Sequence, residues 1–283
     1  MSIPVYGIEH TFLDKDTGLL YRNSSLKETA PLHTHNFYEF FIVTDGTALH
    51  MVNNAIQTLN KGDLVFIRPQ DTHCYDFFYS DNFRIINVGF NNLIFHSIKS
   101  FLECNEELQR LTVIEYPKCI HTNEEALELI SSEFKQIGSL MQTSHAKHTT
   151  FHARCYLASI FVDYFLQYSD SEDKSSGRPQ WLDHMLTEMQ RIENLQSGFP
   201  KMLELSFCSK NHLCRVFKKV LGVKPTEYIN NKRLEYAVYL LTQTTDNIME
   251  ICECCGFSNL SHFYHLFKQK YNCSPVKYRK LYA

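Results

Sequence analysis

The hydrophobic pattern of the first hundred residues is that of short β-strands. Turn signals at Asp45-Gly46, Asn53-Asn54 and Lys61-Gly62 separate four apolar and aromatic runs, which span Phe37 to Thr44, Thr47 to Val52, Asp63 to Arg68 and Phe83 to Phe90. Short strands with turns at this spacing are typical of an all-β sandwich or barrel. We therefore predict a β-barrel within residues 1–120.

After residue 121 the apolar period changes to that of helices. Leu127, Ile130, Phe134, Ile137 and Met141 recur three and four residues apart, and a second series of this kind runs through residues 156–165. The spacing predicts two amphipathic helices, over residues 122–142 and 149–168. Because the helices carry more apolar positions than one barrel face is expected to cover, we expect at least one of them to form a symmetric dimer interface.

A polar stretch rich in Ser, Asp, Gly and Pro, residues 169–179, predicts a linker to a second domain at residues 180–283. The second domain begins with a predicted helix that starts near Pro179 and ends at Gly198. Two similar units follow about fifty residues apart, Phe199 to Lys219 and Asn247 to Lys270. Each unit contains a short helix, a tight turn, a Ser and a helix that ends in Phe-Lys, which indicates an internal duplication.

Each repeated unit has the pattern of a helix-turn-helix motif. In the second unit, Gly256 is predicted to supply the positive φ of the turn and Ser258 to cap the next helix. The apolar face of the preceding helix is predicted to hold Ile248, Ile251, Cys252 and Cys255. Phe263 and Phe267 then face the core, which leaves Asn259, Ser261, His262 and His265 outside.

The first unit repeats this logic with Leu213 and Phe217 directed inward and Asn211, Cys214 and Arg215 outward. Its predicted turn contains Phe207 in place of a glycine. We expect His212 and the cysteines at 252, 254 and 255 to be packing residues, because the cysteine cluster lacks a second pair of ligands at zinc-finger spacing.

Charge differs sharply between the two halves of the chain. The whole chain has a net charge of −3, but residues 181–283 contain 14 Lys and Arg against 9 Asp and Glu. A basic module is thus joined to an acidic one, which favours nucleic acid as the partner of the second domain. Lys210, Lys218, Lys219, Lys268 and Lys270 are suited to phosphate contacts.

Ordered motifs within about residues 180–282 resemble the AraC/XylS family of transcription regulators. They include His-Leu-Cys-Arg-Val-Phe-Lys-Lys219, Gly222-Val-Lys-Pro-Thr-Glu-Tyr-Ile229, Lys232-Arg-Leu-Glu-Tyr-Ala237, Gly256-Phe-Ser258 and Ser274-Pro-Val-Lys-Tyr278. The resemblance implies that a rigid central helix, about Pro225 to Leu241, holds two recognition helices in successive major grooves of double-stranded DNA. The DNA-binding residues predicted by motif and pattern are Lys210, Asn211, Cys214, Arg215, Lys218, Asn259, Ser261, His262, His265 and Lys268.

The first domain contains a pattern similar to the first cupin motif. His33-Thr-His35 is followed by Glu39 and Gly46, and a second partial match contains Gly62-Asp63, Pro69 and His73. In metal-dependent cupins such residues form a set of three histidines and one carboxylate, here His33, His35, Glu39 and His73. The interpretation we prefer is a small-molecule pocket without a metal or other cofactor, while a metal site and merely structural histidines remain as alternatives.

The predicted effector-binding residues are His33, His35, Tyr38, Glu39, His73 and Tyr75, which offer stacking faces and hydrogen-bond partners for a sugar or another polar metabolite. The predicted fold is therefore α+β and multidomain: an N-terminal cupin-like β-barrel with following helices, then a C-terminal all-α domain with two helix-turn-helix motifs. The domains are 1–120 for sensing, 121–168 for dimerisation, 169–179 as linker and 180–283 for DNA binding.

The expected function is ligand-responsive, sequence-specific regulation of transcription by a cytoplasmic homodimer, which would meet RNA polymerase if it is an activator. The predicted genes concern carbohydrates or other small metabolites, and we expect no enzymatic activity. The alternatives are a metal-dependent cupin enzyme with a DNA-binding tail and a ligand-independent dimeric regulator. The chain begins without an apolar leader and has no run of about 18 apolar residues, so no membrane partner is expected.

Overall fold

The computed structural model describes residues 5–6, 13–25, 32–77, 82–143, 145–166 and 179–282. The chain divides into two compact units, one of residues 1–53 and 58–175 and the other of residues 54–57 and 176–283. The predicted linker, 169–179, lies outside the described residues except for its last residue, and the predicted domain boundaries stay predictions.

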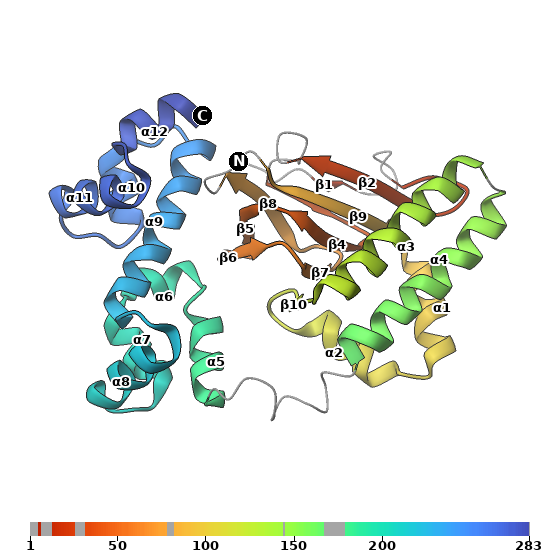
Figure 1. The fold of residues 1–283 in the computed structure, drawn as a ribbon, viewed down its shortest axis with the longest axis horizontal. Helices are drawn as coiled ribbons and strands as arrows, with labels where there is room; N and C mark the ends of the chain where they lie inside the picture. The colour runs from red at the N-terminus through yellow and green to blue at the C-terminus, as the bar shows by residue number, and fades with distance from the viewer. Residues whose placement is uncertain are drawn as a thin grey trace. The chain divides into compact units, whose positions relative to one another are not determined.

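The β-rich part of the chain consists of two five-stranded sheets (Figure 1). The first sheet has the order β1 (Val5–Tyr6), β3 (His33–His35), β8 (Thr72–Phe77), β5 (Thr47–Val52) and β6 (Ala55–Asn60). The second has the order β10 (Cys119–His121), β7 (Asp63–Ile67), β4 (Tyr38–Asp45), β9 (Arg84–Phe90) and β2 (Leu19–Ser25). Strands β1 and β3 are parallel. Six pairs of neighbouring strands are antiparallel, namely β3–β8, β5–β8, β4–β7, β4–β9, β2–β9 and β7–β10.

Alternation along β4 divides its side chains between two cores. Phe41 and Val43 belong to a core that they share with Ala48 and Tyr75 of the other sheet, so this core fills the space between the sheets. Phe40 and Ile42 point to the opposite face and join a second core with the helices of the first unit. Glu39 has the same parity as Phe41 and therefore lies on the inner face.

Helices cover the outer face of the second sheet. They are α1 (Asn92–Leu102), α2 (Asn105–Val113), α3 (Glu124–Thr143) and α4 (Ala146–Ile160), which continues as a π-helix over Phe161–Leu166. In Figure 1, α3 and α4 run side by side, and α3 contacts β2, β4 and β9. The two predicted helices are thus present, and α1 and α2 add a helical pair that the sequence pattern had not predicted.

Most apolar positions of α3 pack against the barrel, and the dimer interface predicted for these helices stays a prediction. Leu127, Ile130, Phe134 and Ile137 of α3 are all buried in the core that they share with the second sheet. The large apolar side chains that α3 and α4 leave exposed are Leu129 and Phe151, with 55% and 67% of their surface accessible. The barrel therefore covers nearly all of the apolar stripe.

The second unit contains short helices around a long central one. They are α5 (Gln180–Glu188), α6 (Ile192–Ser197), α7 (Phe199–Ser206), α8 (Lys210–Leu221), α9 (Pro225–Gln243), α10 (Ile248–Cys254), α11 (Leu260–Tyr271) and α12 (Pro275–Tyr282). The prediction of one helix up to Gly198 is wrong, because the chain leaves the helix after Glu188 and re-enters one at Ile192. Gly198, with φ 69°, ends α6 as predicted.

Candidate nucleic-acid interface and buried histidine cluster

The first helix-turn-helix consists of α7 and α8. Ser209 accepts a hydrogen bond from the His212 N–H at 3.4 Å and so caps α8, as predicted. Leu213 and Phe217 are fully buried. Phe207 occupies the turn with φ 50°, a left-handed conformation that is uncommon for a non-glycine residue, and its side chain is 90% exposed.

The outer face of α8 is polar and basic. Asn211, Arg215 and Lys218 are exposed, as is Lys210, whereas Cys214 is half-buried. One Arg215 Nη lies 3.1 Å from Nδ1 of His212, and the His212 ring packs 6.0 Å from that of Trp181. The guanidinium therefore stands at the surface beside a partly packed histidine, where it can donate to a base edge or a phosphate.

The second helix-turn-helix consists of α10 and α11. A capping box at Asn247 begins α10: its side chain accepts from the Glu250 N–H at 3.0 Å, and Glu250 accepts from the Asn247 N–H at 3.0 Å. The turn passes through Gly256 with φ 79°, as predicted. Phe263 and Phe267 are fully buried, which leaves Ser261 and His265 exposed on α11.

Two local predictions about the second motif are wrong. Asn259, not Ser258, caps α11, because its Oδ1 accepts from the His262 N–H at 2.8 Å. Burial of Phe257 carries the chain one residue further before the helix begins. Cys254 is exposed and is not a packing residue, whereas Cys252 and Cys255 are buried.

The central helix α9 holds the two motifs together. Nε of Arg233 donates to the Leu195 carbonyl at 2.7 Å, and one of its Nη atoms donates to the Gln196 carbonyl at 2.8 Å, so Arg233 caps the end of α6. The same guanidinium lies 5.6 Å from the Phe257 ring centre in the turn of the second motif. Gln196 in turn donates to the Cys254 carbonyl at 2.7 Å.

A buried ion-pair network joins α9 to α11. The Glu235 carboxylate lies 2.8 Å from Nζ of Lys232 and 3.1 Å from Nζ of Lys270. Burial alone would raise the pKa of Glu235, but the two ammonium groups outweigh that effect and hold it below its usual value. Lys270 also donates to the Asn231 carbonyl at 3.0 Å. The prediction that Lys270 contacts phosphate is therefore wrong, because its ammonium group is directed toward α9.

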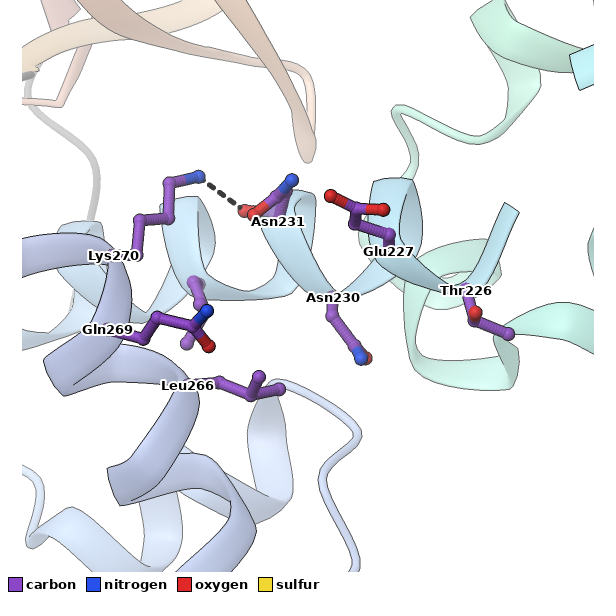
Figure 2. A pocket seen from close by; sticks show the side chains of 8 residues that line it. Thr226, Glu227, Asn230, Asn231, Leu266, Gln269 and Lys270 are labelled. Atoms are coloured by element: carbon purple, nitrogen blue, oxygen red, sulfur yellow. Dashed lines mark hydrogen bonds between the residues drawn. The ribbon is translucent and has the colours of Figure 1, made fainter. Parts of the chain in front are cut away.

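Figure 2 shows the groove between α9 and α11 in which the Lys270 contact lies. It has a volume of about 460 Å³ and is lined by Thr226, Glu227, Asn230, Asn231, Leu234, Leu266, Gln269 and Lys270. Apart from Lys270, none of the residues predicted to contact DNA lines it.

In the first unit, strand pairing brings three histidines together. His33 of β3 stands directly opposite His73 of β8, and His35 follows on the same face of β3. The ring centres of His33 and His73 are 4.4 Å apart, and those of His35 and His73 are 5.3 Å apart. All three side chains are at most 8% exposed.

Glu39 approaches this cluster from β4 of the other sheet. Its Oε2 lies 3.2 Å from Nε2 of His35, and its Oε1 accepts from the Asn87 side chain. Burial would raise the pKa of Glu39, but the hydrogen bonds and charges of His35, His33 and Asn87 hold it below its usual value. The carboxylate is therefore ionised inside the barrel.

The rings of His50 and His73 are held neutral. Burial lowers the pKa of His50 to about 3, with a contribution from the charge of His33. Burial and the neighbouring histidines also hold the pKa of His73 well below its usual value. Burial and the charge of Glu39 raise the pKa of Tyr75 well above its usual value, so this phenol keeps its proton.

Comparisons with known proteins agree with both halves of this description. The family model "AraC-like ligand binding domain" matches residues 19–152, and the model "Helix-turn-helix domain" matches residues 204–281. The HTH-type transcriptional activator RhaS of Enterobacter sp. (strain 638) is 25% identical over 252 residues, which cover 88% of this chain and 87% of that protein. RhaS of Escherichia coli O139:H28 is 26% identical over the same shares.

A solved structure, an apo form of a ToxT variant from Vibrio cholerae strain SCE256, covers 94% of this chain and 98% of that one, at 13% identity and a TM-score of 0.38.

The two family models together span most of the chain, with the sensor and DNA-binding parts in the predicted order. The chain belongs to the AraC/XylS family. It is a transcription regulator with a ligand-binding domain and a DNA-binding domain, and the predicted fold class is confirmed.

In this AraC/XylS sensor domain the cluster differs from the predicted site at two positions. Tyr38 is wrongly assigned, because it points to the outer core, where its ring stacks 4.0 Å from that of Phe95. His50 was missed: it pairs with Tyr75 across β5 and β8, and their rings stack 5.1 Å apart. Its alternation with Ala48 and Val52 places it on the inner face, so strand parity could have found it.

Among the described helices of this AraC/XylS regulator, none combines the length and the apolar character that crossing a membrane requires.

Proposed function

We propose that this chain is a ligand-responsive, sequence-specific regulator that reads DNA through α8 and α11. The observation that carries the proposal is the pair of exposed polar faces on these helices, fixed on one frame by α9. Such a regulator acts in the cytoplasm, where its DNA lies, and meets RNA polymerase there if it activates transcription. The RhaS relatives carry the name of transcriptional activators, which favours activation.

The proposed contacts fall into two kinds. Asn211, Cys214 and Arg215 on α8, and Ser261 and His265 on α11, are placed to meet base edges, with Asn259 and His262 at the start of α11. Since the Asn259 side-chain oxygen caps α11, only its amide NH₂ is left to donate to DNA. Lys210, Lys218 and Lys268 are exposed and are assigned to phosphates.

Arg215→Ala in the full chain tests the DNA-binding proposal. If Arg215 reads a guanine, operator affinity should fall by about 1–3 kcal/mol and one base pair of the operator should lose its preference. A phosphate contact would instead weaken all sequences alike and reduce the salt slope by about one. Binding to an operator and to scrambled DNA, measured over a salt series, separates these outcomes.

Two further variants sharpen this test. Arg154→Ala removes an exposed guanidinium from α4 of the first unit and should leave DNA affinity unchanged. His265→Ala should cost less than Arg215→Ala, since an imidazole makes fewer hydrogen bonds to a base than the guanidinium fork. Unchanged operator affinity in both Arg215→Ala and His265→Ala would show that the recognition faces are wrongly assigned.

The proposed effector is a sugar or another polar metabolite that reaches His33, His35, Glu39, His73 and Tyr75. Support comes from polar groups that converge inside an otherwise apolar barrel, the usual composition of a small-molecule site. The Tyr75 hydroxyl is buried on the same side of the barrel as Glu39 and Asn87, so a polar effector that enters the barrel would meet it. The genes under control would then serve carbohydrate or other small-metabolite use.

Effector titration separates this proposal from a ligand-independent regulator. Thermal unfolding of the chain with a panel of sugars and polar metabolites should identify a stabilising compound, and that compound should change operator affinity. Tyr75→Phe, which removes only the hydroxyl, should weaken the shift while leaving DNA binding intact. A panel that changes neither unfolding nor DNA binding would favour the ligand-independent alternative.

We also propose that the regulator works as a homodimer. The exposed Leu129 and Phe151 are the groups that α3 and α4 leave for such an interface. Sedimentation of the full chain at micromolar concentration should give a dimer, and Phe151→Ser should weaken it while Val113→Ser, an exposed residue of α2, should not. A strictly monomeric chain would refute this part of the proposal.

A further inference from the structure

Three histidines gather at the start of α4, in the helical layer outside the barrel. They are His145, His148 and His152, spaced three and then four residues apart, so they lie along one face of the helix. His145 and His148 are exposed and His152 is half-buried. Because the neighbouring face of α4 is buried in the core through Thr149 and Ala153, the histidine face is directed toward solvent.

The rings of His148 and His152 approach each other closely. Their Nε2 atoms are 3.1 Å apart, and their ring centres are 4.4 Å apart. Two nitrogens that bind one tetrahedral metal ion at about 2.0–2.1 Å lie about 3.3 Å from each other. Two histidines four residues apart on one helix face are also a spacing that binds zinc in proteins. The pair therefore already has the separation that chelation requires.

A hydrogen bond between the two rings is the alternative explanation of this contact. It requires one Nε2 to carry a proton and the other to accept it. Such a bond contributes little at the surface, because water competes for both nitrogens. A metal ion instead uses the Nε2 lone pairs of both rings, and each ring then carries its proton on Nδ1.

His145 places a third imidazole beside the pair. It occupies the N-cap position of α4, but its side chain makes no capping hydrogen bond. An open hollow of about 520 Å³ is lined by His145, His148, Gln142 and Thr143. Since exposed side chains change rotamer readily, the His145 ring can swing across this hollow toward the pair.

The backbone that carries the three rings is held in place. The His145 carbonyl accepts from the N–H groups of His148 and Thr149, at 2.9 and 3.1 Å. The Thr149 hydroxyl donates to the Leu140 carbonyl at 3.0 Å and so joins the first turn of α4 to α3. Fixed backbone positions lower the ordering cost of binding an ion.

The charges around this face do not oppose a cation. The start of α4 carries the positive end of a helix dipole, but α3 ends at Thr143 with the negative end of its own. The last turn of α3, which the structure describes in full, contains no basic residue. Lys147 directly precedes His148 in the helix, so its side chain points about 100° away around the axis.

We propose that His145, His148 and His152 bind a divalent first-row transition metal, with His148 and His152 as the chelating pair and water in the fourth position. Neutral imidazoles suit zinc, copper or nickel better than calcium or magnesium, which prefer oxygen ligands. The bound ion joins the residue before α4 to the first two turns of the helix. The inference depends neither on DNA binding nor on an effector inside the barrel.

The test is zinc binding by the full chain after removal of metal with a chelator. In equilibrium dialysis against Zn²⁺, His148→Gln/His152→Gln should bind one ion fewer per chain than the wild type. His145→Gln should keep this ion but weaken its affinity at least about tenfold, since even an outer partner of a ligand contributes about 10- to 100-fold. Ions held elsewhere, including at the barrel histidines, are common to all variants and cancel in the comparison.

Two variants control for the number of histidines. His96→Gln removes an exposed imidazole from α1 and should keep the ion. His152→Gln/Arg154→His keeps the number of histidines on α4 but places the second ring six residues from His148, on a different face, and should lose the ion. An ion that persists in this variant or in His148→Gln/His152→Gln would overturn the proposal, as would unchanged affinity in His145→Gln.

A measurement on the wild-type chain does not depend on how the variants fold. The imidazole resonances of His148 and His152, assigned with the single variants, should shift together in NMR spectra when zinc is added to the metal-free chain. Resonances that stay unchanged at saturating zinc would refute the site and leave a hydrogen bond between the two rings as the explanation of their contact.

Discussion

Gly256 gives a sharp test of how the second helix-turn-helix is built. A Cβ at this position would lie 2.8 Å from Cα of Gln196 and 2.9 Å from its carbonyl oxygen, closer than real Cβ atoms approach backbone. The backbone φ of 79° adds a second cost for any L-residue. Gly256→Ala therefore combines a conformational penalty with a steric one.

Gly222 separates the two costs. It ends α8 with φ 74°, and a Cβ there would meet nothing within 4 Å. Gly222→Ala should carry only the left-handed penalty, about 1–2 kcal/mol, partly offset by the reduced entropy of the unfolded chain. Gly256→Ala carries the same contributions plus overpacking of about 1–3 kcal/mol. The difference between the variants should therefore be about 1–3 kcal/mol.

Trp181 allows the unfolding of the second unit to be followed separately from that of the first. It is the single tryptophan of the chain, and it packs against the core formed by Leu182, Met202 and Phe217. Its fluorescence in a urea titration of the full chain therefore reports the unfolding of the second unit. Equal losses of unfolding free energy in the two variants would show that the turn does not press against α6, and would refute the close approach.

Three further outcomes are expected. Lys270→Met removes one of the two ammonium partners of Glu235 and should lower the free energy of unfolding by roughly 1–3 kcal/mol, whereas Lys268→Met, on the exposed face, should change it little. Because the pKa of Glu235 is lowered in the folded chain, the carboxylate stabilises the fold above its unfolded pKa and loses that contribution as pH falls through the folded pKa. Stability measured by urea titration below about pH 4.3 should thus depend less on pH in Lys270→Met than in the wild type. A fragment of residues 178–283, checked for helicity by circular dichroism, should bind promoter DNA with an affinity that falls steeply with salt, and a folded fragment that binds no such DNA at low salt would contradict the DNA-binding proposal.

The sequence predicted helices and strands well where turn residues bound a segment whose hydrophobic period is clear. The strand predicted over Thr47 to Val52 has these bounds in the structure, because Gly46 on one side and Asn53-Asn54 on the other adopt positive φ. The helix α1 was missed although Ile94, Phe95 and Ile98 lie on one buried face. Asn91 and Asn92 separate its apolar run from β9, and the Asn91 side chain, which caps the helix, is the signal in the sequence that could have marked this boundary.

The position of a cap depends on packing that the sequence does not display. Ser258 and Asn259 are both good cap residues, and pattern alone does not choose between them. The choice is made by Phe257, whose burial fixes where the chain leaves the turn. The single helix predicted at the start of the second unit is likewise two helices in the structure. The first, α5, ends after Glu188, whose carbonyl accepts from the Asn194 side chain, and no proline or glycine marks the break.

Strand parity decides the composition of the histidine cluster. Tyr38 and Glu39 are neighbours on β4 and must face opposite sides, so both could not line one pocket. The sequence alone could have excluded one of them. Parity also places His50 on the inner face, but its position beside His73 depends on the pairing of β5 with β8, which links residues 23 positions apart.

The frame of the DNA-binding unit depends on polar contacts as well as on its core. Arg233 binds the end of α6 and lies over Phe257 in the turn of the second motif, and Glu235, two residues later, binds Lys270 of α11. Both contacts start from α9, so this one helix sets the separation of the two recognition helices. Neither contact uses an exposed residue of α8. We therefore expect substitutions at Arg215 to alter the proposed base preference without changing the separation of α8 and α11.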